Sequence, residues 1–207
     1  MRLLILLALF GYSASVQSQT FRASLLAGTN FSQVDGDDLL GFHQLGFNGG
    51  ARVVAVLSDH WRIGPELLYS QEGAHRNANS TTGGTLDRIR FHTVSLPVMA
   101  YYHDWRLAAG LGVGYQRLID YRFVTISGRD VTADQQLRDQ AFVLHLGVTL
   151  QLSSHWGVNF RWSRNLTDLR EGPGDRLVSR SLTLRAVYQL GPQEVPRKQP
   201  TNQPLRE

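Results

Sequence analysis

The chain has 207 residues, a formal net charge of +4 and no cysteine. The net charge is small, and the arginines are spread along the chain. Nucleic-acid-binding proteins present a clustered basic face, so this pattern argues against that class. The absence of cysteine excludes disulfide frameworks, thiolate metal sites and the lipid-bearing cysteine of a lipoprotein. With 20 glycines, 9 phenylalanines, 7 tyrosines and 4 tryptophans, the composition favours one all-β domain.

The first residues have the pattern of a secretory signal. Arg2 precedes an apolar run from Leu3 to Phe10, and small or polar residues follow as far as Ser18. The run is too short for a spanning helix, and a buried N-terminal helix is less favoured because helical periodicity is missing. We expect residues 1–18 to be a signal peptide, 19–190 the folded domain, and 191–207, with its four prolines, a disordered periplasmic tail.

Alternation of large apolar residues with polar or tiny ones recurs after the signal. Between Trp105 and Tyr115 the odd positions are apolar or aromatic, whereas the even positions are arginine, alanine and glycine. Period-2 alternation is typical of a β-strand. It predicts eight strands, near Phe21 to Phe31, Leu45 to Leu57, Trp61 to Gln71, Ile89 to Tyr102, Trp105 to Ile119, Ala141 to Leu152, Trp156 to Asn165 and Arg180 to Leu190.

The connections between these strands alternate in length. Short turns fall at 58–60, 103–104 and 153–155, and long polar loops fall at 32–44, 72–88, 120–140 and 166–179. Outer-membrane barrels have short periplasmic turns and long external loops. After Ser18 no apolar run approaches the ~18 residues of a membrane helix, so only a closed barrel could span the membrane. We therefore predict an all-β, eight-stranded antiparallel up-and-down transmembrane β-barrel in the bacterial outer membrane.

A soluble, lipocalin-like barrel is the main alternative fold. Such a barrel would need bulky apolar side chains inside, whereas here the polar face mixes glycine and alanine with Glu66 and several arginines. Long polar side chains between glycines fit a filled interior of eight strands. The Gly-x-Trp motif usual on the first lipocalin strand is also missing from Phe21 to Phe31. We expect the apolar face to point toward lipid.

Hairpin parity gives a register for the short turns. If Leu57 faces Trp61, Arg52 falls opposite Glu66, and both should point inward as a buried ion pair. In the hairpin with its turn at 103–104, facing Tyr102 with Trp105 places Leu96 opposite Leu111 and Ser95 opposite Gly112. In the third hairpin, Val148 falls opposite Phe160 and Gly147 opposite Arg161.

Two groups on the lipid-facing parity are expected at the membrane boundaries. Trp61, Trp105 and Trp156 each follow a short turn, which predicts half of a periplasmic aromatic girdle. Arg90, Arg117, Arg164 and Arg180 fall near the external strand ends. Guanidinium groups cost little free energy at the membrane–water interface and can bind phosphate. We therefore expect these arginines either to contact lipopolysaccharide or to be solvated.

Several short motifs resemble the PorT-like outer-membrane β-barrel family of the Bacteroidota. They are Gly28-Thr29-Asn30-Phe31-Ser32, Gly46-Phe47-Asn48-Gly49-Gly50, the run from Glu66 to Gly73, Leu96-Pro97 and Gly110-Leu111-Gly112. Their order and spacing cover most of the chain after Ser18. The resemblance implies an outer-membrane barrel in a family whose members mostly have no assigned activity and whose namesake is linked to protein secretion.

The sequence offers no cofactor, metal or nucleophile motif. Histidines lack ligand spacing, and Asp35-Gly36-Asp37-Asp38 lacks the glutamate of a calcium-binding EF-hand loop. We expect a structural or interaction protein with four external loops, an unknown protein partner and a possible accessory role in secretion or envelope maintenance. A small transporter or pore is the alternative, and an outer-membrane enzyme with a loop-built site, for example around Asp87 and His92, ranks third.

Overall fold

The computed structural model describes residues 20–35, 44–75, 86–134, 137–170 and 178–191. Within them lie eight strands and a short 3-10 helix: β1 (Phe21–Asp35), β2 (Gln44–Val56), β3 (Trp61–His75), β4 (Leu86–Asp104), β5 (Leu107–Thr125), η1 (Thr132–Asp134), β6 (Gln140–Gln151), β7 (Trp156–Asn165) and β8 (Val178–Leu190). The expected signal peptide and nearly all of the expected tail fall outside the described residues. None of these residues forms a helix long and apolar enough to cross a membrane.

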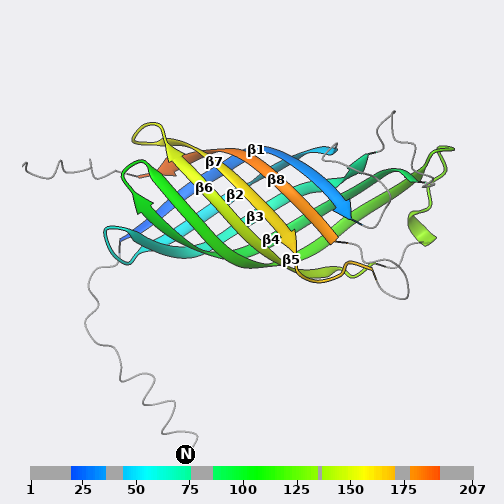
Figure 1. The fold of residues 1–207 in the computed structure, drawn as a ribbon, viewed down its shortest axis with the longest axis horizontal. Helices are drawn as coiled ribbons and strands as arrows, with labels where there is room; N and C mark the ends of the chain where they lie inside the picture. Colours follow the sequence, from blue (N-terminus) through cyan, green and yellow to red (C-terminus); the bar gives the residue numbers. More distant parts are fainter. Residues whose placement is uncertain (1–19, 36–43, 76–85, 135–136, 171–177, 192–207) are drawn as a thin grey trace, which may run out of the picture.

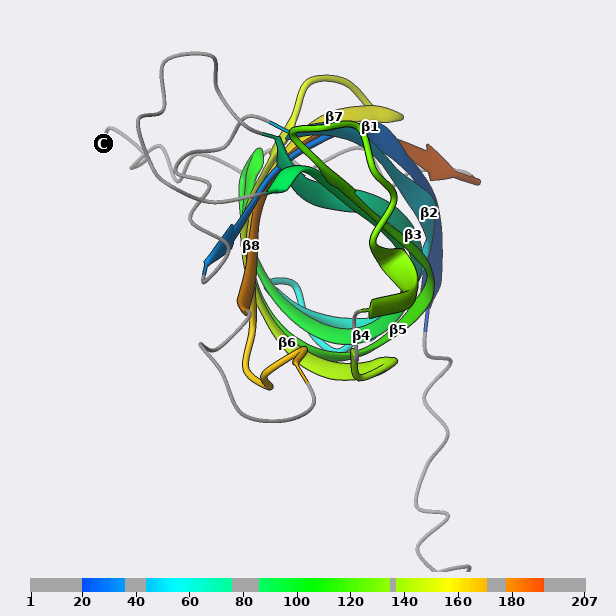
Figure 2. The same ribbon diagram turned by 90° about the vertical axis from the view of Figure 1, so that its right-hand side faces the viewer.

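The strands form one closed antiparallel barrel in chain order, with β8 paired to β1 (Figure 1). Seen from the end, the eight strands make a single ring (Figure 2). The strand pairing can be followed once around the ring, starting at Phe21 and passing through Ile63, Leu111 and Trp162. It returns to β1 at Phe31, ten residues further along the strand. This stagger tilts the strands, and in a barrel of eight strands it leaves an interior that side chains can fill.

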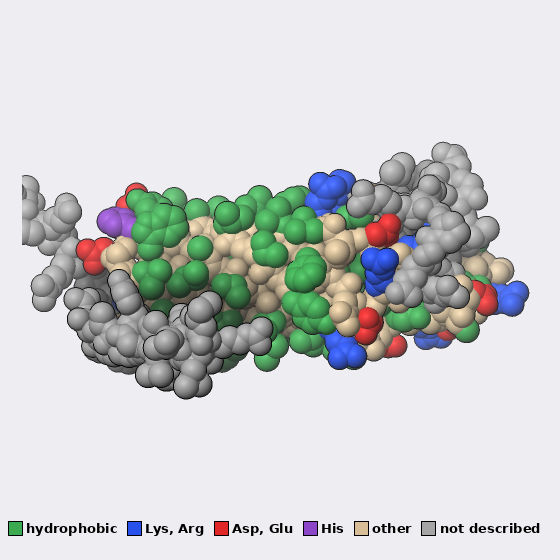
Figure 3. Space-filling view, turned by 90° about the horizontal axis from the view of Figure 1, so that it is seen from below, with side chains coloured by type: hydrophobic (Ala, Val, Ile, Leu, Met, Phe, Trp, Pro, Cys, Tyr) green, Lys and Arg blue, Asp and Glu red, His purple; other side chains and the backbone are tan. Residues whose placement is uncertain are grey.

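Burial follows the predicted alternation, with polar groups inside and apolar groups outside. On β5, Leu111, Val113 and Tyr115 are exposed, whereas the glycines between them are buried. On the face seen in Figure 3, apolar side chains gather in a band over the middle of the barrel. The inward glycines make room for large neighbours, since a Cβ on Gly110 would lie 2.7 Å from the Tyr101 ring. The lipid-facing assignment of the sequence analysis therefore agrees with this surface.

Two of the three predicted hairpin registers are correct. Arg52 pairs with Glu66, and Val148 pairs with Phe160. The β4–β5 register is wrong by four residues, because Leu96 pairs with Tyr115 and Ser95 with Gln116. Pairing continues to Asp104 and Leu107, so that Trp105 and Arg106 form a two-residue turn. Both strands gain ladder hydrogen bonds this way, and Trp105 adopts a left-handed φ of 50° that is uncommon for a non-glycine residue.

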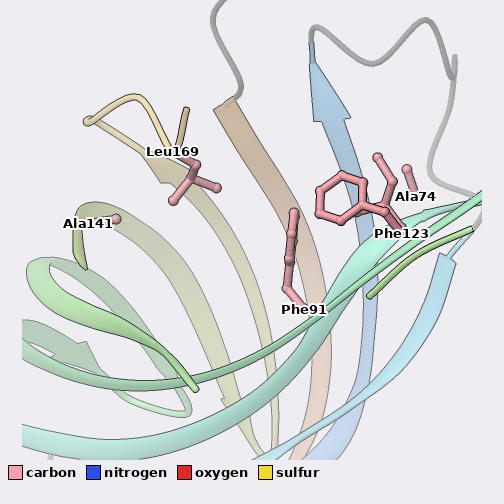
Figure 4. Close-up of a cluster of buried hydrophobic side chains, with 6 residues drawn as sticks. Ala74, Phe91, Phe123, Ala141 and Leu169 are labelled. Atoms are coloured by element: carbon pink, nitrogen blue, oxygen red, sulfur yellow. The ribbon is translucent and has the colours of Figure 1, made fainter. Parts of the chain in front are cut away.

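The strands also extend further toward the long-loop end than predicted. β3 reaches His75, and β4 and β5 together span Leu86 to Thr125. These extensions enclose an apolar cluster of Ala74, Ile89, Phe91, Phe123, Ala141 and Leu169 (Figure 4). The rings of Phe91 and Phe123 meet edge to face at 5.8 Å, and Val131 and Leu137 pack against the cluster from the connecting segment. A small apolar core thus lies above the polar lumen.

Candidate functional site

An ion pair crosses the centre of the lumen. Glu66 on β3 and Arg161 on β7 come from opposite walls, and both are almost fully buried. Arg161 donates from Nη1 to Oε2 of Glu66 at 2.5 Å and from Nη2 to Oε1 at 3.0 Å. The Tyr101 hydroxyl donates to Glu66 and accepts from Arg161 Nη2 at 3.1 Å. A bidentate, charge-assisted contact of this kind fixes the spacing of the two walls.

The predicted pair of Arg52 and Glu66 is also brought together, but less closely. Arg52 Nη1 lies 4.0 Å from Glu66 Oε1, and the Arg52 guanidinium stacks over the Tyr101 ring at 4.9 Å, a cation–π geometry. Alternation along the strand puts Arg161 on the inward face, but it does not join Arg161 to Glu66. Only barrel closure brings β7 across from β3, and no hairpin register carries that information.

Arg185 on β8 forms a second polar group beside the ion pair. Its Nη2 and Nε donate to Asn159 Oδ1 at 2.6 and 3.2 Å, and its Nη1 donates to Asn48 Oδ1 at 3.1 Å. Asn48 in turn donates to Ser70 Oγ at 2.5 Å. Neutral amide oxygens thus satisfy this buried guanidinium, as burial of a charged group requires. The network links β2, β3, β7 and β8.

The lumen has little free volume between these groups. The cavity bordered by Arg161, His145 and Glu72 measures about 20 Å³, and the one beside Phe91 and Gln116 about 10 Å³. A single buried water needs roughly 10–15 Å³ on this scale. Phe91, Ala141 and Leu169 of the apolar cluster line the second cavity. The described interior is therefore packed by its own side chains.

The short-turn end carries two copies of one aromatic arrangement. Trp61 packs on Tyr102 at 5.2 Å, and Trp156 packs on Tyr188 at 4.9 Å. In both turns a serine hydroxyl accepts the backbone N–H of the tryptophan, Ser58 at 3.1 Å and Ser153 at 3.2 Å. Trp105 differs, because it lies in the β4–β5 turn and is 84% exposed, against 50% for Trp61 and 53% for Trp156. The expectation that Trp105 begins a strand is corrected accordingly.

The four outer arginines of the sequence analysis do not form one uniform ring. Arg164 and Arg180 are direct partners on β7 and β8, and Arg117 lies 3.6 Å from Asp139. Val94 is the partner of Arg117, and Arg90 stands four residues beyond Val94, about 13 Å further out along β4. Arg90 instead pairs with Arg122. On the face shown in Figure 3, arginines and carboxylates gather beyond the apolar band.

Metal chemistry finds no support among the residues that the structure describes. No group of three or more histidine, aspartate or glutamate side chains there could hold a metal ion. Asp35 is the end of β1, and the rest of its acidic loop is not described. The strongest built feature of the described chain is thus the packed, charged lumen.

Comparison with known protein families shows the family to which this barrel belongs. The family described as Outer membrane protein beta-barrel domain matches residues 17–171. The chain belongs to this family. It is therefore a bacterial outer-membrane protein, and its apolar band is the surface that meets lipid. A search of curated proteins finds no match.

Solved structures with a similar fold include three outer-membrane proteins. Ail, the attachment invasion locus protein of Yersinia pestis, has 15% identity and a TM-score of 0.49, covering 82% of this chain and 98% of its own. Neisserial surface protein A has 12% identity and a TM-score of 0.48, with coverages of 82% and 97%. OprG of Pseudomonas aeruginosa has 13% identity and a TM-score of 0.36, with coverages of 82% and 94%. At such identities the likeness concerns the fold alone.

Proposed function

We propose that the protein is a sealed membrane anchor without enzymatic activity, which presents its external end to partners. The observation that supports this most strongly is the Glu66–Arg161 contact across the lumen, with free cavities of about 20 and 10 Å³ beside it. A pore would need a continuous aqueous path, and eight strands give an interior just wide enough for side chains. The small transporter or pore is the competing function.

Osmotic swelling of proteoliposomes distinguishes the two functions. Purified barrel is refolded into liposomes loaded with an impermeant polymer and then diluted into an isosmotic solution of a small sugar. The sealed-anchor proposal predicts swelling no faster than in protein-free liposomes. A known outer-membrane porin reconstituted in the same way provides the positive control. Swelling that rises with the amount of barrel would favour the pore.

We propose lipopolysaccharide as the lipid partner of the outer rim. Arg117 stands two residues beyond the exposed Tyr115, and Arg164 and Arg180 stand two residues beyond the paired Trp162 and Leu182. At this external boundary charged side chains cost little. Arginine is well suited to phosphate because its planar group donates bidentate hydrogen bonds. Replacing all three by glutamine should reduce the lipopolysaccharide that co-purifies with the folded barrel. If a folded triple variant keeps the same lipopolysaccharide content, the three arginines are solvated side chains that do not bind the lipid.

The sequence motifs further support a PorT-like role as an accessory to secretion or envelope maintenance, through a protein partner of the external end. This proposal is tested by affinity capture from detergent-solubilised envelopes, using the full chain. The matched control is a barrel whose external segment 126–129 is replaced by glycine and serine. A partner that binds both forms equally would not be recognising that segment.

A further inference from the structure

A basic patch lies on the outward face of the β4–β5 hairpin, beyond the apolar band. Arg88 and Arg90 stand two residues apart on β4, and Arg122 on β5 is the direct partner of Arg90. Arg88 has Val124 as its partner. The three arginines are exposed, and with Val124 they line a hollow of about 70 Å³. Three guanidinium groups therefore border one small space.

This arrangement opposes like charges in the sheet. Residues directly opposite in an antiparallel pair have Cβ atoms about 4.5–5.5 Å apart, and like charges at that distance destabilise the pair. Arg88 is the diagonal neighbour of Arg122 and adds a third positive charge. The same face also carries Asp120, whose partner is His92. An anion seated among the three arginines would turn their repulsion into attraction.

The connection after β5 holds Arg122 in position. Asp130 accepts from Arg122 Nε at 3.0 Å, and Asp130 itself accepts from the Thr132 hydroxyl at 2.6 Å and the Thr132 N–H at 3.0 Å. The bonds from Thr132 lower the pKa of the Asp130 carboxyl, so it stays ionised. Because Asp130 accepts from Nε of Arg122, the Nη1 and Nη2 groups of Arg122 take no part in this hydrogen bond. Asp130 is thus a positioning residue for the patch.

We propose that Arg88, Arg90 and Arg122 form a binding site for a phosphate group carried by a surface sugar. The site lies further out along the strands than Arg117, beyond the apolar band, so it faces groups that extend past the lipid boundary. Planar guanidinium groups from two strands can each offer paired donors to one tetrahedral anion. The inference goes beyond the sealed-anchor function, because a conducting barrel could carry the same site. Free inorganic phosphate shares the chemistry and is the alternative source.

The site is tested by calorimetric titration of the folded barrel in detergent with inositol hexakisphosphate. Arg90→Gln and Arg122→Gln should each weaken binding about tenfold or more, the loss expected for a charge-assisted hydrogen bond. Arg129→Gln, in the same external segment, is the matched control and should bind as the wild type does. The triple variant of Arg117, Arg164 and Arg180 should also bind normally, which separates this site from the lipid contact proposed for the outer rim.

Thermal unfolding supplies a second measurement that does not depend on titration. Without the anion, Arg90→Gln should unfold at a temperature no lower than the wild type, because the substitution removes repulsion. With the anion, only the wild type and the control variants should gain stability. Equal affinity in all variants, or an equal loss in Arg129→Gln, would overturn the site.

The source of the phosphate is separated by a further comparison. Intact lipopolysaccharide and lipopolysaccharide stripped of its core phosphates are each bound to the folded barrel, with inorganic phosphate titrated in parallel. Preference for the intact form, lost in Arg90→Gln, identifies the surface sugar and supports the proposal. Equal binding of the two forms, together with tight binding of inorganic phosphate, contradicts the sugar and identifies a soluble anion.

Discussion

At the level of single residues, the lumen is organised by a carboxylate that several cations share. Glu66 accepts two hydrogen bonds from Arg161 and one from Tyr101, and Arg52 approaches from the neighbouring strand. Taking one partner from a buried pair leaves an uncompensated charge, which costs far more than the pair contributes when intact. The distances rank the partners, since Arg161 approaches to 2.5 Å and Arg52 to 4.0 Å.

This ranking gives a prediction for stability in detergent. Glu66→Ala and Arg161→Met should each lower the free energy of unfolding by about 3 to 5 kcal/mol, with a smaller loss for Arg52→Met. Arg129→Met, at an exposed position, should change it by no more than about 0.5 kcal/mol. Urea unfolding followed by tryptophan fluorescence measures all four. If Glu66→Ala costs less than about 1 kcal/mol, as exposed pairs do, the lumen does not depend on this carboxylate.

The tryptophans give a second prediction at this scale. Trp61 and Trp156 begin their strands after equivalent turns, and each contacts a tyrosine of the next strand, so brominated lipids should quench them at the same depth. Trp105, in a turn and 84% exposed, should be quenched less by lipids brominated deep in the chain. Single-tryptophan variants in liposomes test this. Different depths for Trp61 and Trp156 would contradict a shared membrane boundary.

At the level of strands, alternation decides which face a residue occupies but not how far two strands overlap. A shift of one residue would reverse every face, whereas a shift of four preserves them. The β4–β5 hairpin was mispredicted for this reason, because Leu96 meets an apolar partner in either register. The β2–β3 and β6–β7 turns were predicted correctly, since serine and tryptophan mark their limits. Trp105 resembles those tryptophans in sequence and differs from them in position.

Cross-linking tests the corrected register. The chain has no cysteine, so a pair introduced at Leu96 and Tyr115 is the only thiol pair present. These positions are direct partners, and their Cβ atoms should lie about 4.5–5.5 Å apart. The matched pair at Leu96 and Leu111 would be separated by roughly 13 Å along the strand. Oxidation should therefore cross-link the first pair much faster, and faster cross-linking of the second would restore the other register.

At the level of the whole molecule, closure of the barrel creates contacts that no hairpin contains. Sequence periodicity predicted eight strands, their order and the lipid-facing side, because each follows from local patterns. It did not predict that Arg161 meets Glu66 or that Asn48 meets Arg185. These contacts join strands from distant parts of the chain, and they are the ones that fill the interior.

A filled barrel of this kind should not conduct ions, and single-channel recording in a planar bilayer measures this property. Wild-type barrel should insert without producing steady open-channel currents. The double substitution of Glu66 and Arg161 by alanine removes the crossing ion pair and, if still folded, should raise conductance above the wild-type baseline. Reproducible steady channels in the wild type, unchanged by the double substitution, would contradict the sealed barrel.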